Sequence, residues 1–144
     1  MFLQLLTFSA IFTAMTPFIA KGKLSRFQNK NRLLVVFTPD DIDPQFLIQL
    51  QDYKHHAIGA IERDICKVDI TAMTQEIIVD GRKEAISYTD SLNRLDILSN
   101  RFQVILVGKD GDVKKRWYTP VAMDEVFNEI DAMPMRQREK RMVS

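Results

Sequence analysis

Residues 102–118 read FQVILVGKDGDVKKRWY and have the pattern of a β-hairpin. The first arm, residues 102–107, is almost entirely apolar and rich in β-branched side chains, which suits a strand buried on both faces. The Asp-Gly pair at 110–111 favours the positive φ angles of a tight hairpin turn. The second arm, residues 113–118, carries basic side chains on both faces, as edge strands do. The hairpin therefore predicts a central strand beside an edge strand.

Residues 33–70 predict a βαβ unit. LLVVF at 33–37 is a continuous apolar run that stops before Pro39, which is the form of a central strand. Asp43-Pro44 offers a helix N-cap followed by proline at the first helical position. One apolar helix face follows, at steps of four and three: Phe46, Leu50, Tyr53, Ala57 and Ile61. ICKVDI at 65–70 returns as a second strand, parallel to the first through a right-handed crossover.

Residues 71–99 are less regular. A second Asp-Gly pair at 80–81 lies within a stretch that predicts a small accessory hairpin around residues 75–87. Residues 89–99 predict a short helix, with Thr89 or Ser87 as its N-cap.

The C-terminal part predicts one more helix and a basic tail. The helix opens after Thr119-Pro120, its apolar face recurs with helical spacing, and Pro134 is expected to end it. The tail, residues 135–144, carries Arg136, Arg138, Lys140 and Arg141. A solvated tail is the simplest interpretation, and a contact with anionic lipid or an acidic partner is the alternative.

The order of these elements is strand, helix, strand, helix, strand, strand, helix. A parallel βαβ half followed by an antiparallel ββα half is the thioredoxin-like arrangement. We therefore expect an α/β domain over residues 24–134 with a four-stranded mixed sheet. The strands at 33 and 102 should lie in its middle, with helices on both faces and the first and last helices on the same face.

The first 20 residues contain no charged side chain, and Lys21, Lys23 and Arg26 follow directly. A signal peptide needs an apolar run of about 7 to 15 residues and a membrane span needs about 20. Residues 1–20 therefore predict a signal peptide or a membrane anchor, with a helix or strand of the domain as a third interpretation. In an anchored protein the basic cluster would favour a cytoplasmic domain.

Composition limits the function further. The 144 residues suit one domain, and 20 basic against 19 acidic residues leave a net charge of +1, so we expect no nucleic-acid partner. The chain has one cysteine, Cys66, so an intramolecular disulfide is excluded.

Two stretches of the second half resemble a known family. They are VILVGKDGDVKKR at 104–116 and VFNEIDAMPMRQRE at 126–139. Both resemble the peroxiredoxin-like domain of unknown function found in short bacterial proteins and in extracellular animal proteins such as equarin and the sushi-repeat-containing X-linked protein. GKDG and IDAMPMRQ are the specific motifs; the resemblance covers about residues 24–142, and the first half matches only in pattern. It implies a thioredoxin-like fold, often an export signal, and no established activity.

A thioredoxin-like fold places its reactive group where the first strand meets the first helix, because a helix N-terminus lowers the pKa of a thiol there. In this chain the junction, residues 38–43, reads TPDDID and has no cysteine. Thiol-based disulfide or peroxide chemistry is therefore excluded in its usual form. Cys66, on the second strand, is predicted to be a buried and unreactive small hydrophobe.

The same junction predicts a polar pocket formed by Thr38, Asp40 and Asp41, with Arg101 facing it from the loop before the central strand. A carboxylate and a guanidinium there could hold a small polar ligand or perform acid–base catalysis. The alternative is that the aspartates only cap the helix, at about 0.3 to 1 kcal/mol each.

Two adjacent histidines, His55 and His56, follow in the first helix. Their side chains point about 100° apart on a helix and cannot share a metal ion, so we interpret both as surface residues. No metal or cofactor is predicted.

These features favour a non-redox binding or interaction module of the cell envelope, periplasmic or extracellular. The alternative function is an enzyme, either an atypical oxidoreductase or an acid–base catalyst, that uses the polar pocket. The alternative location is a membrane-anchored one.

Overall fold

A computed structural model describes residues 21–143, and its sheet is built around β1 (Arg32–Thr38), in which all seven residues are buried. β1 pairs in parallel with β2 (Ile65–Thr71) and antiparallel with β5 (Gln103–Val107). The antiparallel β6 (Val113–Trp117) then forms one edge of the sheet. The mixed α/β arrangement, with the two apolar strands side by side in its middle, is as predicted.

The sheet has six strands rather than four, in the order β4-β3-β2-β1-β5-β6. The predicted accessory hairpin exists as β3 (Ile77–Val79) and β4 (Arg82–Glu84), but it pairs with the free edge of β2 and extends the main sheet. Asp80 in its turn fixes this position, because its carboxylate accepts a 2.9 Å hydrogen bond from the Lys67 amide and its own amide donates to the Lys67 carbonyl.

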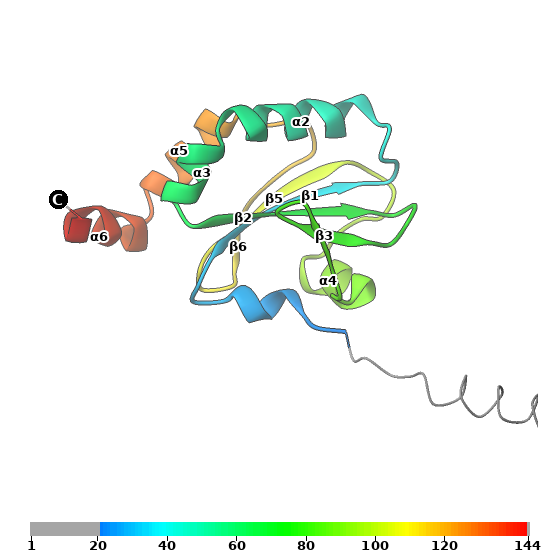
Figure 1. The fold of residues 1–144 in the computed structure, drawn as a ribbon, viewed down its shortest axis with the longest axis horizontal. Helices are drawn as coiled ribbons and strands as arrows, with labels where there is room; N and C mark the ends of the chain where they lie inside the picture. The colour runs from blue at the N-terminus through cyan, green and yellow to red at the C-terminus, as the bar shows by residue number, and fades with distance from the viewer. Residues whose placement is uncertain (1–20, 144) are drawn as a thin grey trace, which may run out of the picture.

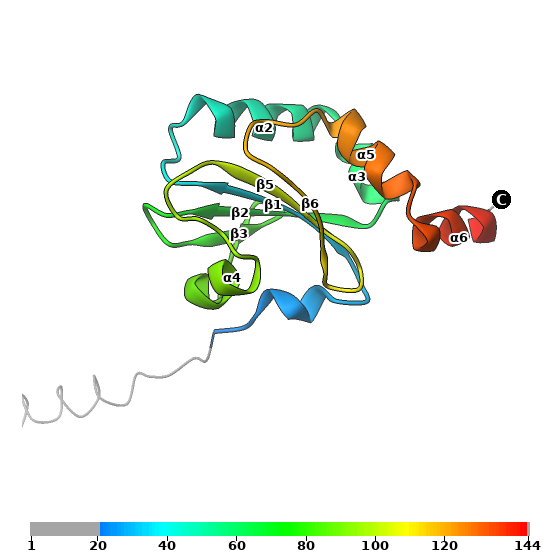
Figure 2. The same cartoon turned by 180° about the vertical axis from the view of Figure 1, so that it is seen from behind.

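Helices cover both faces of the sheet, as Figures 1 and 2 show from opposite sides. One face carries α2 (Pro44–His55), α3 (Ala57–Glu62) and α5 (Met123–Asp131). The other carries the short 3-10 helix η1 (Leu24–Phe27) and α4 (Tyr88–Arg94). The first and last helices of the predicted set therefore share a face, as expected. A further helix, α6 (Pro134–Val143), extends from the end of α5.

The core has two halves because side chains of a strand alternate between the faces of a sheet. Leu34 and Val36 of β1 pack with α2, α3 and α5, whereas Leu33, Val35 and Phe37 pack with η1 and α4. Burial on both faces is what the continuous apolar run predicted.

Two of the three predicted helix starts are confirmed, whereas α5 begins at Met123 rather than directly after Pro120. The Asp43 carboxylate accepts a 2.9 Å hydrogen bond from the Gln45 amide and caps α2, and Ser87 caps α4 by accepting from the Asp90 amide at 3.2 Å. α2 stops at His55 rather than continuing, and Ile61, predicted on the buried face, is 72% exposed.

His56 is not the plain surface residue we expected. It lies between α2 and α3, its Nδ1 is 2.8 Å from the Asp52 carbonyl oxygen, and its ring meets Phe127 edge-on at a centroid distance of 6.0 Å. This contact joins α5 to the break between the two helices.

The segments outside the domain core also differ from expectation. Pro134 begins α6 as well as following α5, so most of the predicted basic tail is helical, over residues 134–143. The predicted signal peptide or anchor, residues 1–20, lies outside the described residues. Within residues 21–143, no helix combines the length and apolar character needed to cross a bilayer.

The contact between α3 and α5 predicts the effect of one substitution. A Cβ atom on Gly59 would stand 2.7 Å from Cε2 of the buried Phe127 ring. Gly59→Ala should therefore lower the free energy of unfolding by about 1 to 2 kcal/mol, although alanine is favoured over glycine in a helix by about 1 kcal/mol. Urea denaturation measures the change. In a Phe127→Leu background the same substitution should be neutral or stabilising; stabilisation in the otherwise unchanged protein would contradict this packing.

Candidate functional site

The β1–α2 loop satisfies most of its own polar groups. The Thr38 side chain is fully buried, and its hydroxyl donates to the Asp40 carbonyl oxygen and accepts from the Asp40 amide at 3.2 Å. The Asp40 carboxylate accepts from the Ile42 amide at 3.1 Å, and Asp41 is exposed. These are the bonds of a helix-capping loop.

Arg101 precedes β5 by two residues, and Gln103 of β5 pairs with Phe37, so Arg101 lies at the same end of the sheet as Thr38. Its guanidinium stacks 3.8 Å from the centroid of the Tyr118 ring. Within the described part of the chain, no hydrogen bond or ion pair joins Arg101 to Thr38, Asp40 or Asp41. The four-residue polar pocket therefore stays a prediction.

Cys66 lies on β2, as predicted, but it is half-buried rather than fully buried. Burial raises the pKa of its thiol to about 12, and the nearby Asp80 carboxylate adds to the shift by its charge and a hydrogen bond. At neutral pH almost none of the thiol is ionised, and the thiolate is the reactive form.

The sequence analysis did not predict a largely buried ion pair on β2. The Lys67 ammonium donates to Asp69 Oδ2 at 2.7 Å, and Asp69 is only 8% exposed. Burial raises the pKa of the Asp69 carboxyl, and Lys67 opposes the shift. Asp69 Oδ1 is buried without a partner among the described residues. The signal was present in the sequence, because alternating Lys67 and Asp69 interrupt an otherwise apolar strand on one face.

Lys67 lines a hollow of about 540 Å³ between α2–α3 and the turn of the β3–β4 hairpin. We call it the α2–β2 groove; it is lined by Tyr53, Lys54, Ala57, Ile61, Ile65, Lys67, Asp80 and Gly81. Its volume lies within the range of about 300 to 1,000 Å³ typical of ligand sites. Burial, followed by the charge of Asp80, raises the pKa of the Tyr53 phenol, which therefore keeps its proton as a hydrogen-bond donor.

The side chains able to ligate a metal ion are dispersed within residues 21–143. No three histidine, cysteine, aspartate or glutamate side chains in that range are grouped so as to hold an ion.

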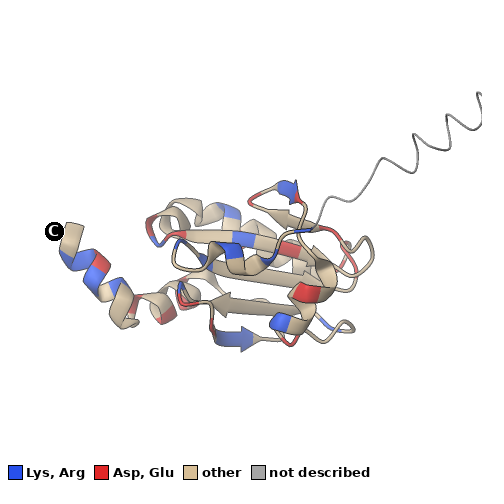
Figure 3. Ribbon diagram, turned by 90° about the horizontal axis from the view of Figure 1, so that it is seen from below, with Lys and Arg blue, Asp and Glu red and all other residues tan. Residues whose placement is uncertain are grey.

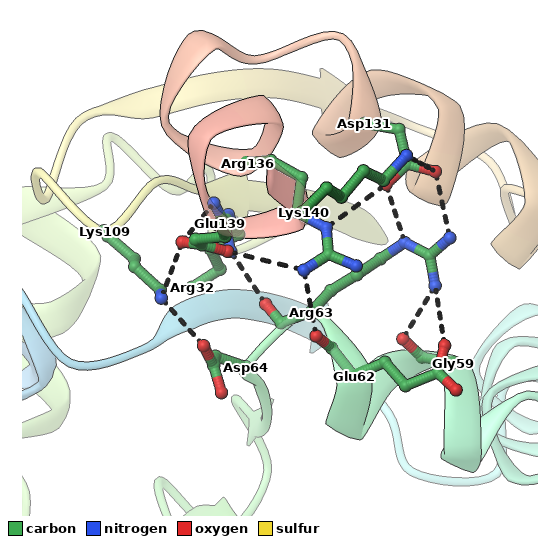
Figure 4. Close-up of polar contacts among 10 residues, drawn as sticks. All are labelled: Arg32, Gly59, Glu62, Arg63, Asp64, Lys109, Asp131, Arg136, Glu139 and Lys140. Atoms are coloured by element: carbon green, nitrogen blue, oxygen red, sulfur yellow. Dashed lines mark hydrogen bonds and ion pairs between the residues drawn. The ribbon is translucent and has the colours of Figure 1, made fainter. Parts of the chain in front are cut away.

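A second polar cluster lies at the opposite end of β1, around Arg32 (Figure 4). Arg32 is 1% exposed, and its two terminal nitrogens donate to the two oxygens of Glu139 in α6 at 3.1 and 3.2 Å. One of them also donates to the Arg63 carbonyl oxygen at 2.9 Å. The Lys109 ammonium donates to Glu139 at 2.9 Å and to Asp64 at 2.8 Å.

Two arginines, Arg63 and Arg136, attach α5 and α6 to the end of α3. Arg63 forms a bidentate pair with Asp131 at 2.9 and 3.0 Å. Arg136 lies 3.5 Å from both Asp131 and Glu139 and donates to the Glu62 carbonyl oxygen at 3.1 Å. Together with the bonds of Arg32 and Lys109 these contacts form what we call the Arg32 network.

The Arg32 network includes two residues of the C-terminal segment, Arg136 and Glu139. Basic residues do recur along α6, as the blue segments near the C mark of Figure 3 show. However, the Arg136 side chain is only 13% exposed, and Glu139 reaches back to the first strand. Residues 134–143 are therefore a helix attached to the domain through Arg136 and Glu139, because a buried guanidinium requires a carboxylate partner. Arg138, Lys140 and Arg141 remain exposed.

The network predicts a pH-dependent contribution to stability. Partial burial raises the pKa of Glu139, but hydrogen bonds from Arg32 and Lys109 outweigh it and lower the pKa to about 2. A lowered carboxyl pKa contributes stability above its unfolded value, 4.5, and loses it as the pH falls towards 2. Glu139→Gln should lower the free energy of unfolding by about 3 kcal/mol at pH 7, because it leaves Arg32 unpaired. The difference from the unchanged protein, measured by urea denaturation, should shrink between pH 4.5 and 2.

Glu62→Gln is the matched control, since its carboxylate is 63% exposed and 4.0 Å from Arg63. It should change stability by less than about 0.5 kcal/mol. An equal effect of the two substitutions would show that the buried pair with Arg32 is not special.

Comparison with solved structures identifies the scaffold. The chain is similar to a reduced 2-Cys peroxiredoxin of Plasmodium vivax, with a TM-score of 0.57 and 18% identity over 81% of this chain and 84% of that one. It is also similar to thioredoxin peroxidase I of Plasmodium yoelii, with a TM-score of 0.55 and 20% identity over 81% and 79% of the two chains. These similarities show a thioredoxin-like fold.

Comparison of sequences identifies relatives and the family. The chain is 25% identical over 115 residues to the sushi repeat-containing protein SRPX2 of Rattus norvegicus, covering 78% of this chain and 25% of that protein. It is 30% identical over 132 residues to coiled-coil domain-containing protein 80 of Danio rerio, covering 81% and 15%. The chain thus spans a quarter or less of these relatives. Residues 23–139 match the family described as Domain of unknown function (DUF4174), and the chain belongs to that family.

Proposed function

We propose that this domain is a non-redox binding module of an exported protein. The observation that carries the proposal is the position of its one thiol. Cys66 lies on β2, outside the β1–α2 loop, and its pKa is raised to about 12. The loop itself offers a hydroxyl and carboxylates, which cannot take part in thiol–disulfide exchange.

The α2–β2 groove is the surface that best suits binding. Ala57, Ile61 and Ile65 give it an apolar wall, and Ile61 exposes 72% of its surface. Lys54 and Lys67 add positive charge, and the protonated Tyr53 phenol adds a donor. An apolar group that carries a negative charge or a hydrogen-bond acceptor suits this combination.

The N-terminal residues support the proposed export and location. The uncharged segment 1–20 followed by Lys21, Lys23 and Arg26 supports a cleaved signal and a place at the cell envelope, in the periplasm or outside the cell. Retention of the segment as an anchor is the alternative. Similarity to proteins named for sushi repeats is consistent with an extracellular module.

The enzymatic alternative has weaker support. The Thr38 hydroxyl is buried and bonded within its own loop, and Arg101 stacks on Tyr118. Acid–base catalysis would need these groups to reach a common substrate.

The groove can be tested with an apolar, anionic dye, 1-anilinonaphthalene-8-sulfonate. Ile61→Asp should weaken dye binding about tenfold, because it places a carboxylate in the apolar wall against the sulfonate. Ile58→Asp is the matched control: Ile58 is 76% exposed on the same short helix but does not line the groove. Fluorescence titration measures both affinities. Equal binding by the two variants would remove the groove as the binding surface.

The thiol can be tested by alkylation. A pKa raised from 9.0 to about 12 leaves about a thousandfold less thiolate at pH 7, so iodoacetamide should modify the native protein far more slowly than the urea-unfolded chain. Mass spectrometry of the intact chain gives both rates. Equal rates, or loss of a binding activity in Cys66→Ala, would contradict a non-redox role.

A further inference from the structure

The two motifs that carry the family resemblance come together in space. GKDG, residues 108–111, forms the turn between β5 and β6, and Met133-Pro134-Met135 of IDAMPMRQ joins α5 to α6. Both line one hollow of about 250 Å³, which we call the motif hollow. It shares no lining residue with the α2–β2 groove, so it is a separate feature of the surface.

Cationic side chains dominate the polar part of the motif hollow. Arg32, Lys109, Lys114 and Arg138 line it, against the single carboxylate of Asp110. Three of these cations already have carboxylate partners: Lys114 lies 2.6 Å from Asp110, Lys109 lies within 2.9 Å of Asp64 and Glu139, and Arg32 lies 3.1 Å from Glu139. Arg138 forms no ion pair or hydrogen bond within residues 21–143, and its charge is therefore available to a ligand.

Arg32 independently indicates that the motif hollow binds a ligand. Its terminal nitrogens are used by Glu139 and the Arg63 carbonyl, as Figure 4 shows. Its Nε, however, is buried and has no partner among the described residues. A buried donor without an acceptor is costly. A ligand oxygen in the hollow that Arg32 lines would satisfy it.

The start of α6 adds positive electrostatic potential to the motif hollow. Pro134 and Met135 at the wall of the hollow are the first residues of this ten-residue helix, whose N-terminus carries partial positive charge. The apolar side chains of Met133 and Met135 limit the remaining space.

We propose that the motif hollow binds a small oxyanion, a phosphate, sulfate or carboxylate group, held by Arg138 and Arg32. Arg138 provides the uncompensated charge, and Arg32 provides a rigid donor fixed in place by the Glu139 carboxylate. A guanidinium pair of this kind suits the planar or tetrahedral oxygens of such groups.

The test is a titration of the full chain with sodium phosphate, monitored by the NMR chemical shifts of the backbone amides. A parallel titration with sodium chloride at the same ionic strength is the control. We expect saturable shifts confined to the amides of residues 108–111 and 135–138. Sulfate and acetate form two further arms. Saturation by phosphate and sulfate alone indicates a tetrahedral oxyanion, and saturation by acetate as well indicates a carboxylate end group; both support the site.

Arg138→Gln should weaken phosphate binding about tenfold, since it removes one charge-assisted contact. Arg82→Gln, on the exposed strand β4, removes the same charge far from the hollow and should change the affinity less than twofold. Unchanged amide spectra elsewhere show that both variants remain folded. Shifts that chloride reproduces, that never saturate, or that both variants weaken equally would overturn the proposal. None of these outcomes bears on dye binding in the groove.

Discussion

A buried guanidinium at the start of the central strand is the constraint on which the rest of the domain depends. Arg32 is 1% exposed, and a charge at that depth is tolerated only with a carboxylate partner and satisfied hydrogen bonds. The partner, Glu139, lies 107 residues later, in the last helix. The first part of α6 must therefore lie close to the start of β1, so that Glu139 can reach Arg32. The family match, residues 23–139, ends at this glutamate and so includes the first part of α6.

The two ends of β1 have separate roles. The N-terminal end holds the Arg32 network and, around it, both motifs of the family resemblance. The C-terminal end, at Thr38, is where peroxiredoxin-like folds place their chemistry, and here it is a capping loop bonded to itself. A fold does not determine a function, and this chain keeps the scaffold without the thiol that the usual chemistry requires.

Local signals in the sequence were sufficient to predict most helices and strands. The contacts between residues far apart in the chain could not be predicted from such signals. Asp43-Pro44 and the apolar run of β1 predicted their elements because caps and strand burial depend on neighbouring residues. The edge that the accessory hairpin joins depends on Asp80 reaching the backbone of β2, and the docking of α6 depends on Glu139 reaching Arg32. Neither partner can be identified from spacing along the chain.

The α2–β2 groove also depends on a contact between distant residues, the pairing of the β3–β4 hairpin with β2. α2 and α3 cover the sheet over β1 and β2, where Phe46 and Ala60 are buried. The hairpin adds two strands beyond that cover, and Ile78 of β3 pairs with Asp69, so it lies on the helix-covered face without a helix above it. The groove forms where the cover of α2 and α3 ends and the β3–β4 hairpin extends beyond it. The alternation of residues in β2 predicts that Lys67 and Asp69 share one face. Their position inside the sheet depends on the two extra strands, because in a four-stranded sheet the same residues would lie at an open edge.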